Sequence, residues 1–136
     1  MNGIDQVDEW LNVPEVAELL RIDMSRVRGL LHERQLVGVK RGERSIFSIP
    51  AAFFVPAHLA NPANPTEPRF HEDGADHYVI LGALRGTFIV LTDVGLSDEE
   101  IIAWLFTPEE SIGTSPIEAL RAGRKSEVRR VAQAML

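Results

Sequence analysis

Two helix-start signals, at Asn12 and Asp23, lie so close together that the first helix of this chain must be short. Asn12 can cap a helix, Glu15 completes a capping box with it, and Pro14 is tolerated in the first turn. That helix must end near Arg21, because Asp23 is the next residue suited to cap one. The segment is therefore predicted to form a helix-turn-helix.

The second helix of this pair is predicted to have a buried side and an outward side. Val27, Leu30 and Leu31 recur at i, i+3 and i+4 spacing, the pattern of a helix packed on a core. In a helix-turn-helix, the start of this helix typically meets base edges in the major groove, where arginine can bond guanine through two hydrogen bonds. The residues expected to face outward there are Ser25, Arg26, Arg28, Gly29 and His32.

A β-hairpin with a basic tip is predicted to follow the two helices. The segments LVGVK and SIFSI, residues 36–40 and 45–49, flank a turn that contains Gly42. A short helix is then expected to start at Pro50 and to close the core with Phe53, Phe54 and Val55. The hairpin would be the wing of a winged helix-turn-helix. Its candidate contacts to phosphate or the minor groove are Lys40, Arg41 and Arg44.

The charge of the chain is negative overall and positive locally. The formal net charge is −6, whereas residues 21–50 contain seven basic and three acidic residues. Residues 1–20 contain five acidic residues and no basic one. A basic surface on an acidic protein is compatible with DNA binding and predicts modest, strongly salt-dependent affinity. The alternative is a small helical core with a solvated basic rim.

A proline-rich segment is predicted to divide the chain. Four of the eight prolines fall within PAHLANPANPTEPRF, residues 56–70. Proline with asparagine and few large apolar residues disfavours both helix and strand, so residues 56–75 are expected to form a linker. The expected domains are a winged helix-turn-helix at residues 1–55 and a C-terminal unit at residues 76–136.

The C-terminal unit is predicted to begin with two helices. The apolar run YVILGALRGTFIVLTDVG suits a buried strand or a buried helix, and its length favours a helix over residues 78–92. Ser97 can cap a second helix over residues 98–106, whose first turn contains three acidic residues that complement the helix dipole. Thr107 and Pro108 would end it.

Two further helices are predicted near the C-terminus. Ser115 and Pro116 open one that ends at Gly123, and Ser126 is expected to cap the last, which runs to Met135. The predicted fold is therefore mainly α with a small β-hairpin wing: a winged helix-turn-helix followed by a small all-α bundle.

The opening Asn12-Val13-Pro14-Glu15-Val16-Ala17, followed by a basic hairpin, resembles the winged helix-turn-helix of the MerR and excisionase superfamily. The resemblance implies that Ser25, Arg26 and Arg28 lie on a recognition helix, and that Lys40, Arg41 and Arg44 lie on a wing. MerR regulators dimerise through a long coiled-coil helix after this domain. Here the proline-rich segment takes its place, so we expect a monomer.

The C-terminal string WLFTPEESIGTSPIEALRAGRKSEVRRVAQAM is similar to the C-terminal domain shared by the Xre, MbcA and ParS antitoxins. That resemblance implies an alternative function, pairing with a RES-type toxin through the C-terminal bundle. Any four-helix core would need the same residue types. The matching residues are Trp104-Leu105, Ser115-Pro116-Ile117, Ala119-Leu120, Gly123 and Val128.

Taken together, the two halves resemble small actinobacterial winged helix-turn-helix regulators that are substrates of a serine/threonine protein kinase. The resemblance implies a DNA-binding regulatory protein whose partners are duplex DNA and such a kinase, or another protein at the C-terminal bundle. The lack of cysteine and of a signal-peptide-like N-terminus makes a cytoplasmic location the expectation. Phosphorylation of an N-terminal tail would weaken DNA binding by adding negative charge. Residues 1–24 contain no Ser or Thr, which moves the expected phosphosite elsewhere, to Thr66 in the linker.

Other functional classes find little support in the sequence. The chain has no cysteine, and no apolar run is long enough for a membrane span. His71-Glu72-Asp73-Gly74-Ala75-Asp76-His77 could bind a divalent metal, but a solvated acidic loop is the simpler interpretation. Thr87 and Ser115 have no evident His and acid partners for a nucleophilic triad. We therefore expect no enzyme activity and no cofactor.

Overall fold

The two helices of the helix-turn-helix begin where their capping residues predict. In the computed structural model, which describes residues 3–135, α1 spans Val13–Leu20 and α2 spans Met24–His32. The capping box at α1 is confirmed: the Asn12 N–H donates to Glu15 Oε1, and the Glu15 N–H donates to Asn12 Oδ1, both at 2.9 Å. Arg21 ends α1 in the left-handed conformation, with φ 56°.

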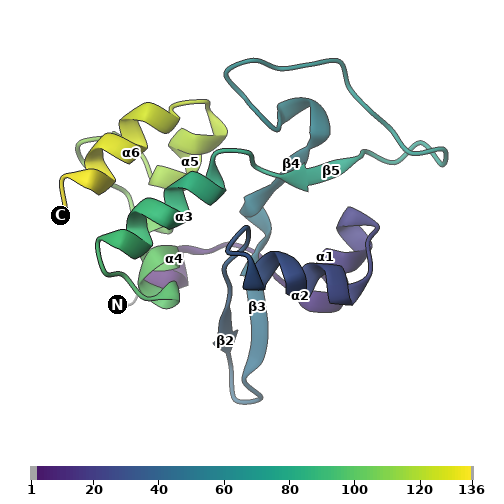
Figure 1. Cartoon of the computed structure of the whole chain (residues 1–136), viewed down its shortest axis with the longest axis horizontal. Helices are drawn as coiled ribbons and strands as arrows, with labels where there is room; N and C mark the ends of the chain where they lie inside the picture. The colour runs from purple at the N-terminus through teal and green to yellow at the C-terminus, as the bar shows by residue number, and fades with distance from the viewer. Residues whose placement is uncertain (1–2, 136) are drawn as a thin grey trace.

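A three-stranded antiparallel sheet carries the wing. Its strands β1 (Trp10–Asn12), β2 (Val39–Arg41) and β3 (Ile46–Pro50) lie in the order β1-β3-β2. Gly42, at φ 77°, begins the turn between β2 and β3 and adopts a conformation that glycine favours. Figure 1 shows this hairpin projecting from the body, with α1 and α2 on one side and α3 and α4 on the other. The predicted winged helix-turn-helix is thus confirmed, with β1 added to it.

Two of the predicted helical segments contain strands. After a short 3-10 turn, η2 (Ala51–Phe53), the chain extends into β4 (Phe54–Pro56), which pairs antiparallel with β5 (Tyr78–Ile80). The predicted helix through Phe54 and Val55 and the predicted first turn of a helix at 78–92 are therefore wrong. Each segment satisfies its backbone hydrogen bonds against the other, a long-range pairing that local periodicity does not reveal.

The C-terminal half is helical, as predicted. Its helices are α3 (Leu84–Asp93), α4 (Asp98–Phe106), α5 (Pro116–Arg121) and α6 (Lys125–Gln133). The predicted cap at Ser97 is confirmed as a capping box with Glu100, and the Ser115 side chain accepts from the Glu118 N–H. The prediction that Ser126 caps the last helix is wrong.

The last helix starts two residues earlier than predicted because of an arginine. Arg124 is the N-cap of α6, and its guanidinium pairs with Glu127 at 2.8 Å while also donating to the Ile112 carbonyl at 2.7 Å. These contacts hold the start of α6 against the preceding loop, so Ser126 lies inside the helix.

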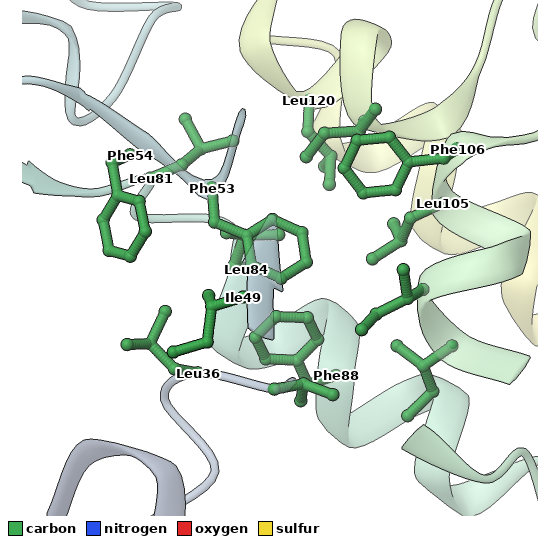
Figure 2. Packing of buried hydrophobic residues seen from close by; sticks show 14 of the residues in the cluster. Leu36, Ile49, Phe53, Phe54, Leu81, Leu84, Phe88, Leu105, Phe106 and Leu120 are labelled. Carbon is green, nitrogen blue, oxygen red and sulfur yellow. The ribbon is translucent and has the colours of Figure 1, made fainter. Parts of the chain in front are cut away.

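One hydrophobic core joins the two halves. The Phe53 side chain, which is fully buried, packs its ring 5.5 Å from that of Phe88 and 5.9 Å from that of Phe106, centroid to centroid. Figure 2 shows Phe53 among Ile49, Leu84 and these two rings. The 3-10 turn η1 (Gly3–Gln6) also packs against α4. The core therefore fixes the winged half relative to the C-terminal helices.

The proline-rich segment leaves the body and returns to it. It contains the 3-10 turn η3 (Ala57–Leu59) and a bridge between Phe70 and Asp76, and it forms the long excursion before β5 in Figure 1. The division into 1–55, 56–75 and 76–136 stays a prediction. Residues 1–2 and 136, at the ends of those ranges, lie outside the described residues. None of the helices within residues 3–135 is long and apolar enough to cross a membrane.

Candidate nucleic-acid interface

The side of α2 that faces away from the core carries the predicted polar residues. Val27 and Leu30 are buried and Leu31 is half-buried, so the packed side of the helix is as predicted. Gly29 is half-buried, close to Glu33. The exposed residues of this helix include Ser25, Arg26, Arg28 and His32.

Arg26 and Arg28 lie on different sides of α2. Residues two apart on a helix are turned by about 200° and do not face each other. Ser25 and His32 share the exposed stripe with Arg28, at spacings of three and four residues. Arg26 lies at the opposite edge of the exposed surface. The structure thus groups Ser25 with Arg28 and separates Arg26 from them.

On the wing, the three predicted basic residues differ in their surroundings. Lys40 and Arg44 are exposed, Lys40 on β2 and Arg44 in the turn. The Arg41 guanidinium carbon instead lies 4.3 Å from the centroid of the Trp10 ring, which is a cation–π contact. Trp10 did not emerge from the sequence as a residue of this surface, because a three-residue strand gives no readable alternation.

Two other basic residues of the winged half are held in ion pairs. Arg34 donates to Asp98 at 2.7 Å and to Thr92 at 3.0 Å, so it connects the segment just after α2 to α3 and α4. Arg21 pairs with Asp73 of the proline-rich segment at 2.6 Å. Among residues 3–135, the winged-half cations whose side chains make no ion pair, hydrogen bond or ring contact are Arg26, Arg28, Lys40 and Arg44.

The surface beside α1 is acidic. A cavity of about 900 Å³ there is lined by four acidic residues, Glu9, Glu15, Glu18 and Asp76. Among the described residues that line it, Arg21 is the one basic residue. Carboxylates repel phosphate, so this surface is unsuited to a nucleic-acid backbone. The basic surface of the winged half is therefore confined to α2 and the hairpin.

The histidine-rich loop does not form a metal cluster. The rings of His71 and His77 lie 4.8 Å apart, centroid to centroid. Partial burial, followed by the Arg21 guanidinium and His77, lowers the pKa of His71. Within the described part of the chain, no group of three or more His, Cys, Asp or Glu side chains is arranged to hold a metal ion.

The residues that resemble the antitoxin domain are largely core residues. Leu105, Ile117, Leu120 and Val128 are all buried. Burial in a helical core accounts for these residue types without a partner protein. The pairing with a RES-type toxin stays a prediction.

Comparison with known proteins agrees with this arrangement over nearly the whole chain. Residues 3–54 match the family described as "DNA-binding protein Rv2175c, wHTH domain", and residues 81–136 match "Rv2175c C-terminal domain of unknown function". The chain is 31% identical over 144 residues to the DNA-binding protein Rv2175c of Mycobacterium tuberculosis (strain ATCC 25618 / H37Rv), covering 97% of this chain and 84% of that protein.

A solved structure gives the same result. The NMR structure of Rv2175c superimposes with a TM-score of 0.68 at 32% identity, covering 93% of this chain and 80% of that one. The expected resemblance to small actinobacterial winged helix-turn-helix proteins is confirmed. The chain therefore belongs to the Rv2175c family of actinobacterial winged-helix proteins.

Proposed function

We propose that this protein is a DNA-binding regulator that contacts duplex DNA through its winged helix-turn-helix. The observation that carries the proposal is that four exposed cations whose side chains have no partner among residues 3–135 lie on α2 and the wing: Arg26, Arg28, Lys40 and Arg44. Cations that are not neutralised within the protein are available to phosphate and to base edges. The name of the relative Rv2175c supports the same function.

The positions of the side chains suggest a division of roles. Arg28 and Ser25 share the outward stripe of α2 and are assigned to base edges in the major groove. Arg26, at the other edge of the exposed surface, is assigned to the phosphate backbone. Lys40 and Arg44 of the wing are assigned to phosphates as well. Arg41 adds positive charge while Trp10 holds its guanidinium.

The first test is a titration of labelled duplex DNA with the full chain at several salt concentrations. Arg28→Ala should cost about 1 to 3 kcal/mol on the preferred site and relax sequence choice. Arg44→Ala should weaken binding to all sequences alike and lower the salt slope by about one. Arg85→Ala is the matched control, because Arg85 is also exposed but lies on α3. If neither Arg28→Ala nor Arg44→Ala changed DNA binding, the assignment of α2 and the wing to DNA would be wrong.

Control by phosphorylation is the finer part of the proposal. Thr66 is exposed in the proline-rich segment, where its backbone N–H donates to the His58 carbonyl. A phosphate there would add about −1.5 to −2 charges, which should weaken DNA binding if the segment approaches the duplex. Thr66→Glu in the same titration should lower affinity at low salt and have less effect at high salt. Equal affinity of the variant and the parent at every salt concentration would argue against regulation at Thr66.

A further inference from the structure

Met24, the first residue of the recognition helix, is a large apolar side chain left outside the core. It is 44% exposed, although Val27 and Leu30 of the same helix are buried. Single exposed apolar residues are common on protein surfaces, so exposure alone assigns nothing. Its place on α2 is what matters, because the proposed function puts this end of the helix in the major groove.

The spacing along α2 places Met24 next to Arg28. Residues at i and i+4 are neighbours on a helix surface, with Cβ atoms about 5 to 6 Å apart. Met24 therefore lies on the Arg28 side of the exposed surface and one turn closer to the start of the helix. This separation corresponds to less than two base-pair steps of about 3.4 Å.

The chemistry of this turn suits base edges and not the phosphate backbone. Asp23, the N-cap of α2, is exposed and makes no side-chain capping hydrogen bond, so a carboxylate that repels phosphate lies beside Met24. The major groove presents one apolar group, the C5 methyl of thymine, which apolar side chains contact. A flexible thioether side chain adapts readily to such a group.

We propose that Met24 is a specificity-determining residue that packs against the C5 methyl of a thymine within two base pairs of the guanine bound by Arg28. The proposal rests on the proposed function, since it requires α2 to enter the major groove. It adds a preference for thymine to the guanine preference expected from arginine.

Replacement of thymine by deoxyuridine tests the proposal, because it removes only the methyl group. A preferred duplex is first selected from a random library with the full chain. Each thymine is then replaced singly, and Kd is measured for the parent, Met24→Ala and Met24→Gln. The guanine bound by Arg28 is the one whose preference is relaxed in Arg28→Ala. At one thymine position within two base pairs of that guanine, the parent should bind the uridine duplex about fourfold more weakly than the thymine duplex, as expected for one buried methyl.

The variants separate a direct contact from a general effect of the methyl on DNA. Met24→Ala and Met24→Gln should bind the thymine and uridine duplexes equally. Met135→Ala is the matched control, because Met135 is 42% exposed and follows α6, which lies on the opposite side of the view from α2 in Figure 1. This variant should keep the fourfold difference.

Two results would overturn the proposal for Met24 without contradicting the proposed function. One is duplex binding by the parent with no uridine-sensitive position near that guanine. The other is a uridine effect that persists in both Met24 variants. Failure of the parent to bind any duplex at low salt would instead overturn the proposed function, and the role of Met24 with it.

Discussion

Four basic residues of the winged surface and two of the C-terminal helices have opposite surroundings. In the C-terminal half, Arg121 donates to the Ala52 and Phe54 carbonyls at 2.7 and 3.2 Å, and Arg124 pairs with Glu127. On α2 and the wing, Arg26, Arg28, Lys40 and Arg44 have no such contact within residues 3–135. The first group stabilises the fold, whereas the second is available to a partner.

This difference explains how an acidic protein can keep a basic contact surface. The net charge of −6 is a property of the whole chain. Long-range steering depends on the summed charge, but contacts within a Debye length, about 8 Å at physiological salt, depend on the local charges. Cations that are paired within the protein contribute little to long-range steering or to local contacts with a partner. The number of unpaired cations on one surface is therefore more informative than the net charge.

The largest expected effect comes from breaking the core that joins the two regions. Phe53→Ala should destabilise the protein by about 3 to 5 kcal/mol, because Phe53 is fully buried between the winged half and the C-terminal helices. The measurement is urea denaturation followed by fluorescence.

The two tryptophans allow each half to be followed separately. Trp10 lies on β1 and Trp104 on α4, so the variants Trp10→Phe and Trp104→Phe each leave one reporter. With the shared core intact, both reporters should give the same midpoint. Two distinct midpoints in these otherwise unaltered proteins would mean that the halves unfold independently, as the predicted linker at residues 56–75 would allow.

A second prediction sharpens the contrast between paired and unpaired arginines. Arg121→Ala should destabilise the fold by about 1.5 to 3 kcal/mol, because it removes charged hydrogen bonds to two carbonyls of the winged half. Arg44→Ala should change stability by no more than about 0.5 kcal/mol. Thermal denaturation of both variants at one protein concentration compares them. Equal losses would contradict the division into structural and available cations.

A third prediction compares the same capping device in the two regions. Asn12→Ala and Ser97→Ala should each cost about 1 kcal/mol, because each removes the side chain of a capping box. The double variant should lose the sum, since the two caps share no partner. Asn64→Ala is the control and should be neutral, because the Asn64 side chain is exposed and makes no hydrogen bond within residues 3–135. A strongly non-additive double variant would show that the caps are coupled.

The smallest expected effect concerns the ion pair between Arg21 and Asp73. The Ala75 backbone N–H, and then Arg21, lower the pKa of Asp73. A carboxylate with a lowered pKa stabilises the fold at pH values above the ordinary aspartate pKa of about 3.9, and this contribution is lost as the pH falls through the lowered pKa. Arg21→Ala should therefore raise the pKa of Asp73, as measured by carboxyl carbon NMR, whereas Arg85→Ala should not.

Local signals predicted much of this fold because their partners lie a few residues apart. Asn12 and Glu15, like Ser97 and Glu100, satisfy each other within one helical turn, and both helix starts were confirmed. The prediction for Ser126 was wrong because Arg124 bonds the Ile112 carbonyl across a loop. The assignments of Ser25, Arg26, Arg28, Lys40, Arg41 and Arg44 to DNA stay predictions.

The sequence by itself determined the winged helix-turn-helix, its exposed polar residues and the helical character of the C-terminal half. Capping, apolar spacing and turn residues are local, and they act before any distant contact forms. The tertiary structure alone decided that Phe54–Pro56 and Tyr78–Ile80 pair as strands, that Arg41 contacts Trp10, and that Arg34 is tied to Asp98. Each of these joins residues far apart in the chain, so only the packed core, by bringing them together, determined which cations remain available.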